Sequence, residues 1–121
     1  MVNYLLDYQH LLQRGIVVFD ELLGLYAPDR KAEKDWATVT VMQTHNQRNS
    51  LSERLADPPA HLTAEETSSV TVSIGHYLDS HWADYQEVPT VNPQKHARVV
   101  ELHAELENII AAMAPIHNAL R

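Results

Sequence analysis

The chain of 121 residues has no cysteine. This absence excludes disulfides, thiolate metal sites and a cysteine nucleophile, and nothing points to an oxidising compartment. Only three glycines are present, which leaves little room for glycine-rich phosphate-binding loops, and no nucleophile elbow or zinc-protease motif occurs. We therefore expect a non-enzymatic protein with no catalytic residue and no cofactor.

Basic residues are absent from one long stretch of this acidic chain. Residues 58–92 contain five acids and no Lys or Arg, within a net charge of −7. Nucleic-acid binding needs a basic footprint, so no nucleic-acid partner is expected. No apolar run approaches the ~18 residues of a membrane span, and Asp7 and Arg14 interrupt the apolar start, which also lacks a signal-peptide pattern. We expect one cytoplasmic domain.

The stretch from Tyr4 to Tyr26 is the most apolar part of the chain. In an α-helix its apolar residues form adjacent rows at a spacing of seven, which is wider than the stripe that a surface helix needs. A helix this apolar needs other helices packed against it along its whole length. Gly15 lies near its middle, and we interpret it as a tolerated glycine in preference to the alternative, the close approach of another helix.

Two further helices are predicted between proline-bearing connections. The segment 32–56 follows Ala27-Pro28-Asp29 and has a polar middle from Thr44 to Ser50. The segment 63–87 begins with a capping box in which Thr63 caps the helix and Glu66 reaches back. An alternative remains open, because residues 37–43 and 68–74 also contain the alternation typical of strands.

The last helix is predicted from residue 93, where Asn92-Pro93 supplies an N-cap and a first helical residue. Pro115 predicts a kink or an early end near Ala114. Helices at about 3–26, 32–56, 63–87 and 93–114 predict an all-α, up-down-up-down four-helix bundle over residues 1–121. The alternative fold is an α+β domain with a small sheet.

Eight histidines raise the hypothesis of a metal site. The presence of histidines on all four predicted helices resembles the hemerythrins. His96 and Glu101 have the spacing of the histidine and carboxylate on the last helix of that family. However, His45 is followed four residues later by Asn49 in place of Glu, and no His-x3-His occurs on the third helix. Glu-x-x-His, which carboxylate-bridged di-iron bundles require on two helices, is also absent. We therefore expect no metal ligand and interpret most histidines as half-exposed residues.

The segment His45-Asn46-Gln47-Arg48-Asn49-Ser50-Leu51 resembles the H-box of sensor histidine kinases. This resemblance implies that His45 is an alternative phospho-accepting residue in a phosphotransfer-like bundle. Asn46 stands where that family has an acid, which puts the activity in doubt. The competing interpretation is a polar layer in the seam between helices, which fixes register at some cost in stability.

A broader resemblance covers residues 4–81. Residues 8–15 (Tyr-Gln-His-Leu-Leu-Gln-Arg-Gly), Asp35-Trp36, Arg48 with Leu51, and residues 77–81 (Tyr-Leu-Asp-Ser-His) resemble the flagellar type III export chaperones of the filament-cap, FliT-like, kind. The resemblance implies a cytosolic chaperone or adaptor for flagellum biogenesis that holds an amphipathic helix of an export substrate between its own helices.

The wide apolar surface of the first helix predicts more than a core. Large exposed apolar patches are rare on monomers, so the excess should be buried in a symmetric homodimer or form a groove for a partner's helix. The residues predicted to bind the partner lie at the edges of the apolar rows: Leu6, Ile16, Val17 and Leu23.

Overall fold

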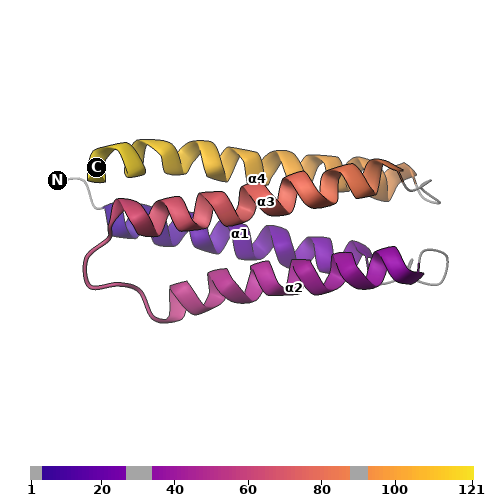
Figure 1. Ribbon diagram of the computed structural model, residues 1–121, viewed down its shortest axis with the longest axis horizontal. Helices are drawn as coiled ribbons and strands as arrows, with labels where there is room; N and C mark the ends of the chain where they lie inside the picture. The colour runs from indigo at the N-terminus through magenta and orange to yellow at the C-terminus, as the bar shows by residue number, and fades with distance from the viewer. Residues whose placement is uncertain (1–3, 27–33, 88–92) are drawn as a thin grey trace.

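A computed structural model describes residues 4–26, 34–87 and 93–121, with the side chains of residues 4–25, 42–79 and 97–121. It contains four long helices, α1 (Tyr4–Tyr26), α2 (Lys34–Ala56), α3 (Ala64–Glu87) and α4 (Pro93–Leu120). Successive helices run in opposite directions (Figure 1). The predicted up-down-up-down bundle is confirmed. The alternative sheet is wrong, because residues 37–43 and 68–74 are helical and the described part of the chain contains no strand.

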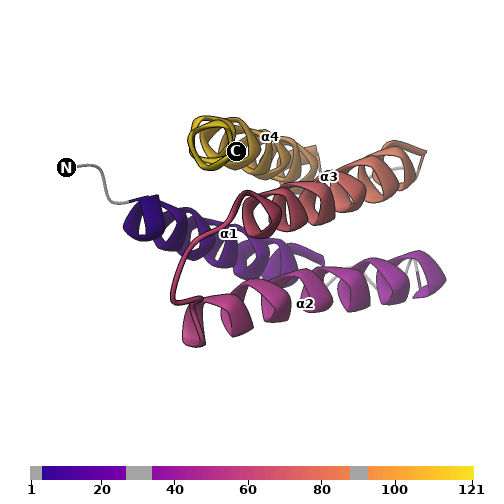
Figure 2. The ribbon, with the colours of Figure 1, turned by 60° about the vertical axis from the view of Figure 1, so that its left-hand side comes forward.

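The helices are arranged in sequence order around the bundle. α1 packs against α2 and α4, and α3 packs against α4 and α2. Figure 2 shows the four helices obliquely, with the long connection between α2 and α3 at one end. None of the helices, over the residues that the structure describes, is both long and apolar enough to span a membrane.

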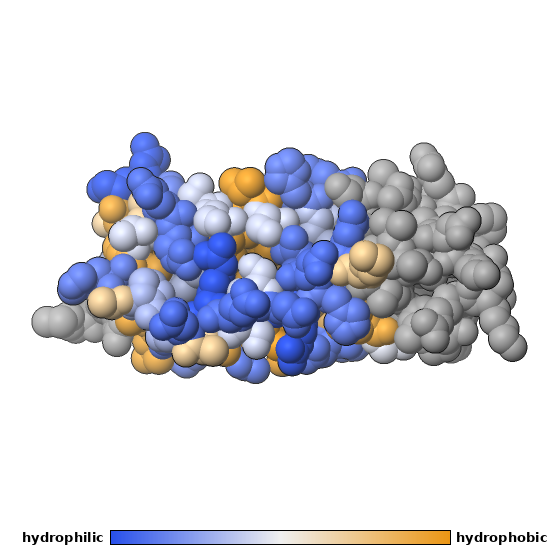
Figure 3. All heavy atoms as spheres, turned by 60° about the horizontal axis from the view of Figure 1, so that its bottom comes forward, coloured by the Kyte–Doolittle hydropathy of each residue, from blue (hydrophilic) through white to orange (hydrophobic). Residues whose placement is uncertain are grey.

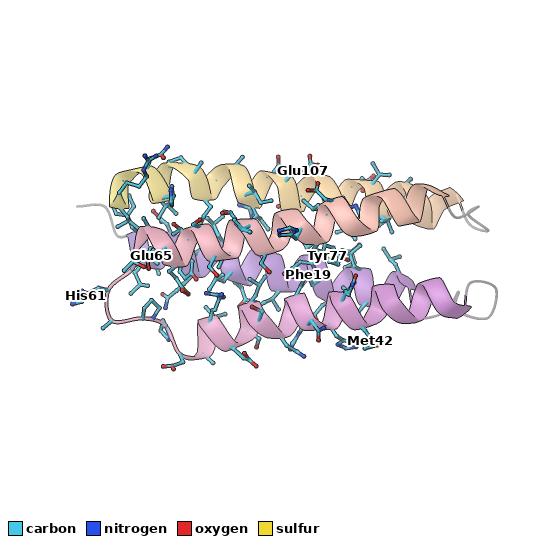
Figure 4. All side chains as sticks on the ribbon, viewed as in Figure 1. Phe19, Met42, His61, Glu65, Tyr77 and Glu107 are labelled. Atoms are coloured by element: carbon cyan, nitrogen blue, oxygen red, sulfur yellow. The ribbon has the colours of Figure 1, made fainter. Side chains whose placement is uncertain are left out.

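Among the side chains that the structure describes, the core comes mainly from α1, α3 and α4. Figure 4 shows Phe19 of α1 beside Tyr77 of α3 in the interior, with their rings edge to face and 5.2 Å between centroids. Among the described side chains, α2 contributes one buried apolar residue, Leu51. The other buried hydrophobic side chains are Tyr8, Leu11, Leu12, Ile16, Val18, Phe19, Leu22, Val70, Ile74, Tyr77, Leu78, Val99, Leu102, Leu106, Ile109, Met113 and Ile116.

Gly15 corrects one prediction about α1. A Cβ atom at Gly15 would lie 2.6 Å from Cδ1 of Leu51 on α2. That distance is too short for two carbon atoms without some movement, since carbon contacts are optimal at ~3.5–4.0 Å. The preferred interpretation of Gly15 as a merely tolerated glycine is therefore wrong: its missing side chain admits Leu51.

Pro115 does not end α4, so the early end predicted near Ala114 is wrong. The helix continues to Leu120. Proline removes the hydrogen bond to the carbonyl four residues earlier, that of Ala111, but Ala111 and Pro115 are both exposed, so water can solvate this carbonyl. Beyond the proline, Ile116 is buried and Leu120 packs on the core, which holds the last turn in place.

The predicted start of α3 is confirmed at Thr63. The backbone N–H of Glu66 donates to Oγ1 of Thr63 at 3.2 Å, and α3 begins at Ala64. The other predicted boundary residues, Ala27 to Asp29 and Asn92, lie outside the described residues.

Candidate functional site

A groove of about 470 Å³ lies between α1 and α4. Val17, which is 57% exposed, lines it together with the buried Val18 and Leu102. The remaining lining residues are polar or charged: Gln13, Arg14, Glu21, Arg98, Glu101 and Glu105. The groove thus combines a small apolar floor with a charged rim.

Ion pairs bridge α1 and α4 along this rim. Arg98 of α4 donates to both carboxylate oxygens of Glu21 on α1 and to Glu101 at 2.8 Å. Arg14 of α1 pairs with Glu105 of α4. The hydrogen bonds from Arg98 and Arg14 lower the pKa of Glu21 and of Glu105, respectively. Exposed pairs of this kind contribute only about 0–1 kcal/mol each, so a partner can rearrange them at little cost.

The four residues predicted to bind a partner fall into different environments. Val17 lines the groove, and Leu6 is 45% exposed eleven residues earlier, which places both on one side of α1 after three turns. Leu23 is partly buried. Ile16 is 7% exposed and belongs to the core, because the α1 surface that it shares with Leu12 and Phe19 faces the interior, so it is not available to a partner.

The polar middle of α2 forms cross-helix hydrogen bonds to α3. The hydroxyl groups of Thr44 and Tyr77 are 2.8 Å apart, and Thr44 is completely buried. Three residues further along α2, Gln47 Oε1 accepts a hydrogen bond of 3.0 Å from Ser73 Oγ. The polar stretch is therefore divided between a layer in the α2–α3 seam and a solvent-facing side.

Over the described side chains of residues 42–56, the solvent-facing side of α2 is mainly hydrophilic. Figure 3 shows a face of the molecule that includes α2, where hydrophilic atoms predominate and hydrophobic ones form separate spots. His45, the alternative phospho-accepting residue, is exposed there with Asn46 and Asn49. Met42, 60% exposed, points away from the bundle (Figure 4). His45 is accessible to solvent, but no acidic residue directly follows it in the sequence.

A partly buried polar cluster joins α1, α2 and α3 near the start of α3. Oε1 of Glu66 accepts hydrogen bonds from the Tyr8 hydroxyl at 2.9 Å and from Arg54 at 2.6 Å. Arg54 also donates to Ser69 at 3.1 Å. The sequence pattern indicates only the capping box for Glu66, because Tyr8 and Arg54 are distant from it in the sequence.

The cluster perturbs the acid–base behaviour of its members. Burial, followed by the hydrogen bond and charge of Glu66, raises the pKa of Tyr8 well above its usual range. Burial alone would raise the pKa of Glu66, but the hydrogen bonds from Arg54 and Tyr8 outweigh it and lower that pKa. At neutral pH Tyr8 is therefore a neutral phenol, Glu66 a carboxylate and Arg54 a guanidinium cation. Their charge-assisted hydrogen bonds hold α1, α2 and α3 together.

The histidines are dispersed over the bundle. His103 is buried with its ring 6.2 Å from that of Tyr77, and His117 Nδ1 lies 3.0 Å from the carbonyl oxygen of Ala64. His117 is half-buried, so among the described histidines only His103 lies in the interior, in contrast to the half-exposed positions expected for most of them. The exposed ones are His10, His45, His61 and His76, and the side chains of His81 and His96 lie outside the described residues.

No three potential metal ligands lie together within the described parts of the chain. The described residues form instead the small groove between α1 and α4 and a polar seam between α2 and α3.

Comparison of the chain with protein-family models, with curated proteins and with solved structures finds no match.

Proposed function

We propose that this protein is a non-enzymatic helical adaptor or chaperone that binds an amphipathic helix of a partner protein in the groove between α1 and α4. The observation that supports this proposal is Val17, a large apolar side chain 57% exposed in a concave site with charged edges. An amphipathic helix docks through apolar anchors flanked by polar residues, and the groove presents the complement of that pattern.

The size of the groove defines what it can hold. Its volume of about 470 Å³ suits one or two apolar side chains, and Leu6 lies on the same side of α1, three turns away. A helix lying along α1 would place anchors near both residues. The rim contains three glutamates and two arginines, and this excess of one negative charge favours a partner with basic residues beside its apolar stripe.

The resemblance to flagellar type III export chaperones suggests a more specific form of the proposal. In that form the partner is a helix of an export substrate and the protein acts in the cytoplasm. A second copy of the chain is the other occupant to distinguish, since a symmetric homodimer would also cover Val17.

Val17→Glu tests the proposal with a matched control in the same fold. Val72 on α3 is the same residue type and has nearly the same exposure, 55% against 57%, so Val72→Glu introduces the same charge away from the groove. Each variant and the wild type serve as bait for affinity capture from the native cytosol, followed by mass spectrometry. Far-UV circular dichroism checks that both variants remain helical.

We expect a defined partner to be captured by wild type and by Val72→Glu and to be lost with Val17→Glu. Sedimentation equilibrium of the same three proteins identifies the occupant: a dimer that dissociates only in Val17→Glu means that a second copy fills the groove. If all three proteins are monomers and the two variants capture the same proteins, Val17 marks no binding site and the proposal fails.

A further inference from the structure

Two ion pairs close the groove between α1 and α4 at its two ends. On α1, Arg14 precedes Val17 by three residues and Glu21 follows it by four, which places all three on one face of the helix. Arg14 pairs with Glu105, and Glu21 pairs with Arg98. Both pairs cross from α1 to α4, and they are separated by two helical turns, about 10 Å along α1.

The floor of the groove between these pairs is apolar. The buried side chains of Val18 and Leu102 line it together with the exposed Val17. Its volume of about 470 Å³ is bounded along the helices by the two ion pairs. The groove therefore suits a single long side chain that enters from outside.

The charge of the rim is not balanced along the groove. Arg14 and Glu105 pair one to one, whereas Arg98 donates to two carboxylates, those of Glu21 and Glu101. The Glu101 side chain is 64% exposed, against 39% for Glu21. Within the described residues, the structure gives Glu101 one hydrogen bond, at Oε2. The excess negative charge therefore lies at Glu101, whose Oε1 is open to a cation from a partner.

We infer that the groove takes a lysine side chain from the partner's helix. The aliphatic stem of this lysine lies on Val17, Val18 and Leu102. Its ammonium group donates to Oε1 of Glu101. A lysine has the required form, since it combines a flexible aliphatic stem with a compact charge. This inference rests on the proposed function and makes it more specific, because it states which side chain of the partner enters the groove.

Other classes of side chain fit this site less well. A leucine gains the apolar floor but covers the Glu101 carboxylate, and the loss of water without a new hydrogen bond is costly for a charged group. A glutamate brings a like charge to the same carboxylate. An arginine binds best where both carboxylate oxygens are free, and Arg98 already binds one oxygen of Glu101.

Three helical peptides that differ at one position test the inference. Each is an acetylated and amidated synthetic peptide of Ala, Gln and Leu with an apolar stripe, and the central residue of the stripe is lysine, norleucine or glutamate. Norleucine has an unbranched aliphatic stem like that of lysine but no ammonium group. The full-length chain is labelled with carbon-13 at its methyl groups, and the NMR signals of Val17, Val18 and Leu102 report binding.

Glu101→Gln and Glu107→Gln provide a matched pair of variants. Both glutamates are exposed on α4, but Glu107 lies about 120° around the helix from Glu101 and does not line the groove. Glu101→Gln leaves two glutamates and two arginines in the rim and so removes its excess charge. Far-UV circular dichroism checks that both variants remain helical.

We expect the lysine peptide to shift the three methyl signals and to bind roughly three- to tenfold tighter than the norleucine peptide. The preference for lysine should persist in Glu107→Gln and disappear in Glu101→Gln. The glutamate peptide should bind most weakly, because its charge repels Glu101.

The inference is overturned if the lysine and norleucine peptides bind equally, if Glu101→Gln and Glu107→Gln respond alike, or if the lysine peptide leaves the three methyl signals unchanged. Failure of the proposed function is a different result, because it depends on whether Val17→Glu loses the captured partner. If Val17→Glu loses that partner and the norleucine peptide binds as tightly as the lysine peptide, the groove binds an apolar side chain. In that case the proposed function stands and only the inference about lysine is wrong.

Discussion

The glycine at position 15 provides the sharpest test of the packing between α1 and α2. Gly15→Ala adds one methyl group in the middle of α1, and the structure places Leu51 Cδ1 2.6 Å from that atom. Gly75 lies in the middle of α3, and no atom lies within 4 Å of the place that its Cβ would take. Neither glycine has a positive φ angle, so Gly75→Ala is the same chemical change without the steric conflict.

Only one of the two substitutions should stabilise the fold. Each gains about 1 kcal/mol of helix propensity. At position 15 the added methyl group forces the buried Leu51 to move, and overpacking of a core costs roughly 1–3 kcal/mol. Gly15→Ala should therefore be neutral or destabilising by up to about 2 kcal/mol, while Gly75→Ala should stabilise by about 1 kcal/mol.

Urea unfolding followed by far-UV circular dichroism measures both values. Leu51→Ala supplies the decisive background, because it removes the atom that the new methyl group would meet. In that background Gly15→Ala should stabilise about as much as Gly75→Ala does, so the double-mutant cycle should show a favourable coupling of about 1–3 kcal/mol. Equal stabilisation by Gly15→Ala and Gly75→Ala in the wild-type background would refute the close approach of α2.

Four further predictions concern the polar cluster, His45 and the metal content. The lowered pKa of Glu66 gives stability that is present above its ordinary value of 4.5 and lost as the pH falls through the lower folded value, so Glu66→Gln should flatten the acid side of a plot of urea midpoint against pH. Tyr8→Phe, which removes the hydrogen bond to Glu66, should lower the free energy of unfolding by about 1–2 kcal/mol, measured by the same method. His45 should not take phosphate efficiently from a phosphorylated receiver domain, and an acid-labile, base-stable label that disappears in His45→Gln would contradict this. Protein purified without an affinity tag should contain no stoichiometric iron or zinc by elemental analysis.

The fold was predictable because its information is local in the sequence. Thr63 as N-cap, Pro93 at the start of α4 and the apolar periodicity of α1 each act within one or two turns, and the helices begin and end close to the predicted positions. The early end predicted at Pro115 was wrong for the opposite reason. Its cost depends on whether Ala111 is exposed and on whether Ile116 is anchored, and both are properties of the folded bundle.

The candidate sites were less predictable because they depend on neighbours from other helices. The polar stretch of α2 was visible, but its division into a buried layer and an exposed side depends on Tyr77 and Ser73, which lie 33 and 26 residues away from their partners. His103 did carry a usable pattern, since it shares a heptad position with Ile110, which packs on the core.

The apolar surface of α1 is wider than a surface helix needs, and the sequence therefore predicts that a partner covers part of it. The structure uses most of it internally, because α1 is in contact with both α2 and α4 and its apolar rows are buried from Tyr8 to Leu22. Among the described side chains of α1, the large apolar ones that remain exposed are Leu6 and Val17, on the side of the helix opposite Gly15. A partner at that side would therefore gain little from apolar contact alone, and it needs the charged rim of Arg14, Glu101 and Glu105 to bind specifically.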